Sequence, residues 1–228
     1  MADKIRVQKY MAQQGLCSRR QAEKWIEQGW VTLNGNIIDQ QGIKMDPDQD
    51  HIEINDQAKQ QQAACITIKY YKPRGIVTHS PSEGETCIAD IIDKKYQQLA
   101  PVGRLDKESE GLILLTNNGV FAKQCLDQKN PHPRVYEIKV SKPMTPQMIS
   151  QCEEGIMILG QITKPCTVKM LAPLRYEITL FEGKNRQIRR MMQHVGNMVI
   201  RLKRISFGSV NIGNLQPNDA QVIESSII

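Results

Sequence analysis

Residues 101–119, with the sequence PVGRLDKESEGLILLTNNG, join a charged loop to an apolar segment. Leu112–Leu115 carries only apolar side chains, which predicts a buried strand. A strand anchored in this way would hold the loop before it in a fixed position.

Further segments of β type lie on both sides of this strand and alternate with short helices. Thr145-Pro146 is typical of a helix start, and that helix is expected to end at Gly155. Because most of the strands alternate apolar and polar residues, we expect an α+β domain with a mixed, mainly antiparallel sheet and flanking helices. The strands are expected at Ile66–Tyr71, Leu112–Thr116, Tyr136–Val140, Tyr176–Phe181 and Val199–Ile205.

The N-terminal residues 1–56 are expected to form a separate small α/β domain. Lys4–Gln14 is helical in composition, and Ser18 followed by Gln21 predicts the capped start of a second helix. Asn34-Gly35 between two apolar pairs is typical of a tight hairpin. The glutamine-rich residues 57–64 lack apolar periodicity and are interpreted as a linker, which leaves residues 65–228 as the larger domain.

Composition restricts the function classes. The 228 residues are 40% apolar and 24% charged, which is typical of a soluble globular protein. No apolar run is long enough for a membrane span and the N-terminus lacks a signal peptide, so a cytoplasmic protein without membrane contact is expected. Six scattered cysteines form no CxxC pair, so buried thiols are favoured over metal or redox chemistry, and no nucleotide-binding loop occurs.

The positive charge is concentrated rather than spread. The formal net charge is +6, yet residues 184–204 contain seven basic side chains and no acidic one. Ile188, Met191, Met192 and Val195 fall on one face of a helix there, with Asn185 as its cap. A polyanion such as a nucleic acid is the natural partner of such a segment, although a solvated helix face has the same composition.

The charged loop offers one carboxylate between two bases. Arg104 and Lys107 flank Asp106, and positive neighbours favour an ionised carboxylate that can act as a nucleophile. A solvated surface aspartate would have the same neighbours. Asp106, Glu108 and Glu110 could instead share one side of an extended chain and bind a divalent cation, as in an RNA hydrolase, or supply a glycosidase-like acid pair.

Four ordered segments resemble the RsuA/RluB/RluE/RluF family of ribosomal-RNA pseudouridine synthases, with the RluF branch as the nearest. The resemblance includes Gly103-Arg104-Leu105-Asp106 in the charged loop and Lys72-Pro73-Arg74-Gly75 before it. It continues with Arg134-Val135-Tyr136 and with Asn185-Arg186-Gln187-Ile188-Arg189-Arg190. Gly15–Ala22, together with Asn34-Gly35, resembles the S4-like RNA-binding domain.

The resemblance implies an enzyme that isomerises uridine to pseudouridine in ribosomal RNA, more often of the large subunit than of the small. It implies Asp106 as the nucleophile, Tyr136 as the residue that stacks on the uracil, and Arg189 as the basic residue paired with Asp106. Leu202 would line the uracil pocket. The implied RNA contacts are Arg104, Lys184, Arg186 and Arg190, with Arg19 and Arg20 at the start of a helix in the N-terminal domain.

No cofactor or metal is expected for this isomerisation. A monomer that acts on ribosomal RNA, free or in an assembling particle, is the expected state. The alternative from another class is a ribosomal-RNA-binding or ribosome-assembly factor that keeps the fold and performs no chemistry. It would be favoured by a changed aspartate, tyrosine or arginine, and all three residues are present.

Overall fold

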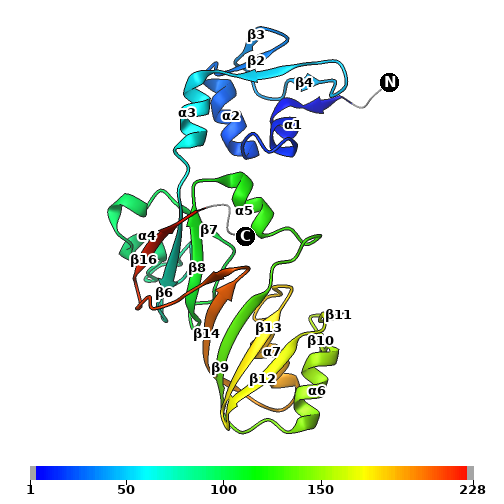
Figure 1. Cartoon of the computed structure of the whole chain (residues 1–228), viewed down its shortest axis with the longest axis vertical. Helices are drawn as coiled ribbons and strands as arrows, with labels where there is room; N and C mark the ends of the chain where they lie inside the picture. Colours follow the sequence, from blue (N-terminus) through cyan, green and yellow to red (C-terminus); the bar gives the residue numbers. More distant parts are fainter. Residues whose placement is uncertain (1–3, 225–228) are drawn as a thin grey trace. The chain divides into compact units, whose positions relative to one another are not determined.

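The computed structural model describes residues 4–224. The chain forms two compact units, each with most of its residue contacts inside itself (Figure 1). The smaller unit takes in the chain up to Ile66 together with Thr116–Gln124, and the larger unit contains Thr67–Leu115 and the chain from Cys125 onward. Within residues 4–224, no helix is long and apolar enough to cross a membrane.

The smaller unit packs helices against a three-stranded antiparallel sheet. Its first helices are α1 (Val7–Gln13) and α2 (Arg19–Glu27). The sheet has the order β3 (Asn36–Ile38), β2 (Val31–Leu33) and β5 (Ile52–Ile54), and β1 (Ile5–Arg6) pairs separately with β4 (Lys44–Met45). The core contains Val7, Met11, Ala22, Trp25, Ile26, Val31 and Met45.

Local sequence signals explain the main turns of this unit. The Ser18 hydroxyl accepts a hydrogen bond from the Gln21 amide at 3.2 Å, which caps α2 as predicted. Asn34 and Gly35 have φ values of 52° and 80°, the conformation that a tight hairpin requires. The first helix begins at Val7 rather than at Lys4, because the two residues before it pair with β4.

The segment that we expected to be a linker is helical. Residues Asp56–Ala63 form α3, whose start is capped by the Asn55 side chain. The Gln61 side chain accepts hydrogen bonds from the Trp25 indole at 2.6 Å and from the Gln21 amide group at 2.9 Å. Glutamine is a good helix former, so a polar segment without apolar periodicity can still become a helix that is tied down by hydrogen bonds. The domain limits 1–56 and 65–228 stay predictions.

A nine-stranded sheet forms the centre of the larger unit. Its main path is β12 (Thr167–Ala172), β13 (Arg175–Leu180), β9 (Arg134–Val140), β14 (Val199–Phe207), β8 (Glu110–Thr116), β6 (Thr67–Lys72) and β16 (Ala220–Ile223). Strand β7 (Ala100–Val102) pairs with β8, and β15 (Val210–Asn211) pairs with β14. The pair β8 and β14 is parallel, whereas β14 is antiparallel to β9, as β9 is to β13. The predicted mixed, mainly antiparallel α+β sheet is confirmed.

Short helices flank this sheet. They are α4 (Ile88–Ile91), a 3-10 turn at Lys94–Tyr96, α6 (Pro146–Glu154) and α7 (Gln187–His194). A small hairpin joins β10 (Met157–Ile158) to β11 (Gln161–Ile162), and α5 (Gly119–Cys125) follows β8. Helix α6 begins and ends as predicted, with the Thr145 hydroxyl as its cap.

The inner face of the sheet carries the residues that matter for the site. Tyr136 lies opposite Arg204, and Ile138 lies opposite Leu202, so these four side chains project from the same face of β9 and β14. Helix α7 turns its predicted apolar face inward, since Ile188, Met191, Met192 and Val195 are all buried.

Gly111 allows β8 to lie close against β14. Its φ is +104°, and a Cβ atom there would lie 2.3 Å from the carbonyl oxygen of Arg204. Any other residue would push the two strands apart. The charged loop, which ends where β8 begins, is therefore held near β14.

Candidate active site

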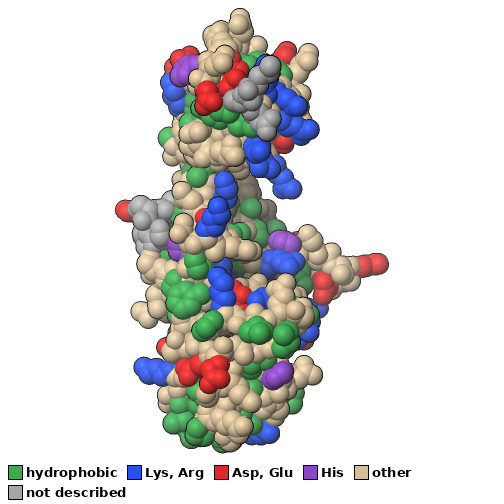
Figure 2. Space-filling model, turned by 90° about the vertical axis from the view of Figure 1, so that its right-hand side faces the viewer, with side chains coloured by type: hydrophobic (Ala, Val, Ile, Leu, Met, Phe, Trp, Pro, Cys, Tyr) green, Lys and Arg blue, Asp and Glu red, His purple; other side chains and the backbone are tan. Residues whose placement is uncertain are grey.

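The predicted loop opens onto a cavity of about 450 Å³ in the larger unit. Tyr136 and Leu202 line its inner wall and are buried. On the face of the molecule that Figure 2 draws, several Lys and Arg side chains are exposed, with acidic side chains between some of them. The other predicted site residues that line the cavity are Arg104, Asp106, Lys184 and Arg186.

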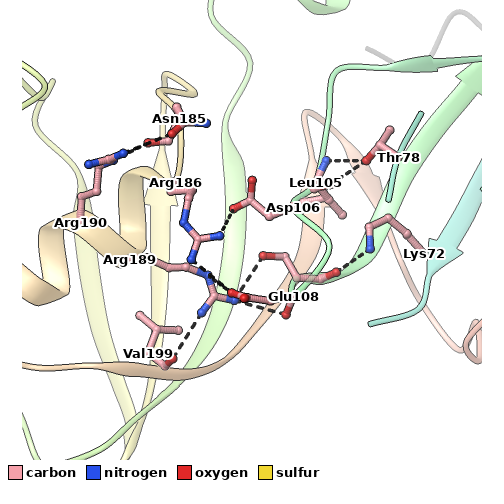
Figure 3. Close-up of polar contacts among 11 residues, drawn as sticks. Lys72, Thr78, Leu105, Asp106, Glu108, Asn185, Arg186, Arg189, Arg190 and Val199 are labelled. Carbon is pink, nitrogen blue, oxygen red and sulfur yellow. Dashed lines mark hydrogen bonds and ion pairs between the residues drawn. The ribbon is translucent and has the colours of Figure 1, made fainter. Parts of the chain in front are cut away.

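Asp106 reaches the cavity with 32% of its side chain exposed. Its nearest cation is Arg186, whose Nη1 lies 3.9 Å from the Oδ2 atom of Asp106 (Figure 3). The flanking bases play a smaller part than predicted, because Lys107 pairs with Glu85 at 2.9 Å and Arg104 is exposed at the wall of the cavity. Sequence proximity was a poor guide here, since the side chains of a turn point in different directions.

Contacts from the segment after β6 fix the backbone around Asp106. The Thr78 hydroxyl donates to the Leu105 carbonyl at 2.7 Å and accepts from the Leu105 amide at 3.0 Å. The Gly75 amide donates to the Lys107 carbonyl at 2.7 Å. Because both neighbours of Asp106 are held by their backbones, the stretch of backbone that carries the carboxylate is fixed at the cavity.

Lys72 anchors the far end of the loop from inside the protein. Its side chain is completely buried, and the ammonium donates to the carbonyl oxygens of Pro73 and Ser109, each at 2.8 Å. Burial lowers the pKa of Lys72 to about 8, against the opposing attraction of Asp106 and Glu110. The sequence pattern assigned no role to this lysine.

Arg189 does not form the predicted ion pair with Asp106. Its guanidinium donates to the carbonyl oxygens of Glu108 at 3.2 Å and Val199 at 3.3 Å, and its Nε lies 4.0 Å from the Glu108 carboxylate. Burial lowers the pKa of Arg189, and the charge of Glu108 opposes that effect. Arg189 thus connects the charged loop to the start of β14, while Arg186 supplies the positive charge beside Asp106.

The start of α7 differs from the prediction. Asn185 is not the cap; the cap position is taken by Arg186, in the left-handed conformation with φ of 50°. Arg190 donates to the Asn185 carbonyl at 3.2 Å and does not line the cavity, and Figure 3 shows it on the side away from Asp106. Lys184 pairs with Glu182 at 2.8 Å at the cavity wall.

The three acidic residues do not share one side of the chain, so the metal-site interpretation is wrong. Glu110 is buried and accepts hydrogen bonds from the Tyr71 hydroxyl at 2.8 Å and from Arg201 at 3.1 Å. The bond from Arg201 is the main cause that lowers the pKa of Glu110. Glu108 pairs with Arg186 at 3.2 Å. Among residues 4–224, no cluster of three or more His, Cys, Asp or Glu side chains could hold a metal ion.

The cysteines agree with the expectation of unreactive thiols. All six are free, and only Cys65 is not buried. Burial raises the pKa of Cys17 to about 12, which keeps this thiol protonated near neutral pH.

A basic groove lies on the smaller unit. Arg19 lines it together with Lys4, Arg6, Lys9 and Lys44, of which only Arg19 was predicted as an RNA contact. Arg20 is exposed at the next position of α2 and does not line the groove. The sequence signal missed the other cations because they come from separate elements that the fold brings together.

A single carboxylate among cations, in a cavity of the size that binds small ligands, together with a separate basic module, defines an enzyme that acts on a nucleic acid. The comparisons with known proteins identify the family. Residues 66–194 match the family model described as RNA pseudouridylate synthase, and residues 5–50 match the S4 domain. The chain belongs to the RNA pseudouridylate synthase family, and the predicted enzyme class is confirmed.

Individual relatives agree along nearly the whole chain. The dual-specificity RNA pseudouridine synthase RluF of Escherichia coli K12 is 38% identical over 213 residues, which cover 92% of this chain and 72% of that protein. The ribosomal large subunit pseudouridine synthase B of Bacillus subtilis 168 is 33% identical, with coverage of 95% and 91%. A crystal structure of a pseudouridylate synthase matches with a TM-score of 0.70 and 26% identity over 97% of both chains. The predicted RsuA/RluB/RluE/RluF resemblance is confirmed.

Proposed function

We propose that this protein converts a specific uridine of ribosomal RNA to pseudouridine, and that the uridine belongs to the large subunit. The observation that carries the proposal is the position of Asp106 in a basic cavity whose wall contains Tyr136. Similarity to a Bacillus subtilis protein named for the large ribosomal subunit favours that subunit over the small one.

The chemistry we propose begins with the Asp106 carboxylate. In the isomerisation, the bond between the ribose carbon C1′ and the uracil nitrogen N1 breaks, the uracil rotates, and C1′ bonds to the uracil carbon C5. The proton on C5 leaves and N1 gains one, so no electron or atom enters from outside. Asp106 stabilises the separated sugar by its negative charge, as a covalent or an ionic partner. Arg186 places a positive charge beside Asp106, and Arg189 holds the backbone of the charged loop through a hydrogen bond to the Glu108 carbonyl.

The remaining cavity residues would hold an everted nucleotide. A uridine in folded RNA must leave its stack before its glycosidic bond can be reached. Tyr136 offers a buried ring for stacking against the uracil, and Leu202 projects from the same sheet face to line the base pocket. Arg104, exposed at the cavity wall, would contact the strand that the uridine leaves.

The substrate strand would be bound mainly through its phosphates. Lys184 and Arg186 line the cavity, and we assign them this role in preference to Arg190. In the smaller unit, Arg19 and Arg20 open α2, where free backbone amides add to their charge. We further propose a cytoplasmic monomer that needs no cofactor and acts on ribosomal RNA, either free or within an assembling particle.

The experiment that tests this function combines purified protein with transcripts of large-subunit and small-subunit ribosomal RNA, followed by mapping of pseudouridine at each uridine. We expect one large-subunit position or a few to be modified, with the RNA chain intact and no effect of a metal chelator. Modification confined to small-subunit RNA would overturn the subunit assignment. Tight RNA binding without any pseudouridine would favour the non-catalytic binding factor.

A further inference from the structure

Two arginines in the wall of the cavity have no acidic partner among residues 4–224. Arg134 lies on β9, two residues before Tyr136, and Arg204 lies on β14 directly opposite Tyr136. Neither guanidinium forms an ion pair with any described residue. Neither residue has a role in the chemistry proposed above.

Arg204 is the more deeply buried of the two, with only 3% of its surface exposed. Its Nε donates to the Leu112 carbonyl at 2.7 Å, which fixes the plane of the guanidinium. Its Nη2 atom is buried and makes no hydrogen bond to any residue within the described range. A buried donor without a partner is costly, because it has lost its hydrogen bonds to water and gained none in the protein.

Arg134 faces the same region of the cavity. The guanidinium carbons of Arg134 and Arg204 lie 5.1 Å and 5.5 Å from the centroid of the Phe207 ring. The described residues give the Arg134 side chain no hydrogen bond. Burial is the main cause that lowers the pKa of Arg134, and the positive charge of Arg204 lowers it further.

A buried cation with a partly buried one beside it, and no anionic partner among residues 4–224, is destabilising unless a ligand supplies the negative charge. We propose that Arg134 and Arg204 together bind one phosphate of the substrate strand next to the everted uridine. The proposal rests on the function proposed above, because it assumes that the nucleotide enters this cavity. The two arginines then position the nucleotide for Asp106 by a charged contact beside Tyr136.

A phosphate fits these residues better than the uracil edge does. Guanidinium groups bind phosphate oxygens through parallel charge-assisted hydrogen bonds, and two guanidinium groups can share the charge of one phosphate. The neutral uracil offers carbonyl oxygens but no charge that would offset two cations. Gly183, also in the cavity wall, lies next to this pair, because a Cβ atom there would be in van der Waals contact with the guanidinium carbon of Arg134 at 4.0 Å.

The test compares binding of uridine, uridine 5′-monophosphate and uridine 3′-monophosphate to the full chain by calorimetric or NMR titration. We expect the wild type to bind one of the two monophosphates about ten- to hundredfold more tightly than uridine. Arg204→Gln and Arg134→Gln should each remove most of that preference, while affinity for uridine changes less than about twofold. Arg204→Lys should restore part of it. Lys169→Gln, at an exposed position of β12 away from the cavity, is the matched control and should keep the full preference.

Several results would overturn the proposal. Equal affinity of the wild type for all three ligands, or no binding of any of them, would show that no phosphate is held here. The variants could instead lose the preference for uridine monophosphate over cytidine monophosphate and keep the preference for the monophosphate over uridine. That result would assign the arginines to base recognition. If Arg204→Gln fails to fold, Arg134→Gln, whose position is only partly buried, still decides the matter. Because the titration needs no turnover, a failure to form pseudouridine would be a separate finding about the proposed function.

Discussion

Replacing Gly111 with alanine tests whether the close contact of β8 and β14 builds the site. The residue has a φ of +104°, and the new Cβ would meet the carbonyl oxygen of Arg204 at 2.3 Å and its amide nitrogen at 2.8 Å. The backbone strain at such a φ costs about 1–3 kcal/mol for a residue other than glycine. Separating two packed backbones adds about 1–3 kcal/mol. The two contributions together give an expected loss in free energy of unfolding of about 2–6 kcal/mol.

Gly84→Ala is the matched control, because Gly84 also belongs to the larger unit, has a φ of +76° and has nothing within 4 Å of its added Cβ. It should cost only about 1 kcal/mol. Urea unfolding followed by circular dichroism measures both variants. Trp25 and Trp30 both belong to the smaller unit, so their fluorescence reports that unit separately and should change little. Equal losses for the two alanine variants would refute the reasoning about β8 and β14.

Three further substitutions test the polar contacts. The pKa of Glu110 is lower in the folded protein than in the unfolded chain, because the carboxylate pairs with Arg201. This ion pair therefore stabilises the fold at pH values above the ordinary glutamate pKa, and the stabilisation is lost as the pH falls through the folded-state pKa. Glu110→Gln should therefore be less stable than the wild type at pH 7 in urea unfolding, and the difference should disappear in acid; a constant difference would contradict this. The pKa of Lys72 is lowered from 10.5 to about 8 in the folded protein, so on raising the pH the folded state loses this proton before the unfolded state does. The wild type should therefore gain stability relative to Lys72→Met as the pH rises from about 8 towards 10.5. That variant should also lose activity, since the Ser109 carbonyl loses its donor, and full activity would argue against the anchoring role. Ser18→Ala should lower the stability of the smaller unit by about 1 kcal/mol in tryptophan-monitored unfolding, and an unchanged midpoint would argue against the cap.

The features that the sequence predicted well depend on local backbone chemistry. Helix α6 lies between a Thr-Pro start and a glycine stop, and the Asn34-Gly35 hairpin needs only two residues that tolerate positive φ. The buried face of α7 follows from helical periodicity alone. Each of these signals lies within a few residues of the structure that it determines.

The features that sequence analysis missed depend on contacts between distant segments. The partner of Asp106 could not be identified from its neighbours, because the turn before α7 brings Arg186 to it from 80 residues further along the chain. The burial of Lys72 depends on carbonyl groups that point inward only after β6 and the charged loop have packed. The helical α3 escaped prediction because its stabilising contacts are hydrogen bonds from Trp25 and Gln21 rather than an apolar face.

Asp106→Asn is the most direct test of the central claim, since it removes the negative charge and keeps the shape of the side chain. The variant and the wild type are compared in pseudouridine formation on the ribosomal RNA that the wild type modifies, and in affinity for the same RNA. We expect no detectable pseudouridine with the variant and an RNA affinity within a fewfold of the wild type. Pseudouridine formation at the wild-type rate would contradict the assignment of Asp106 as the catalytic carboxylate.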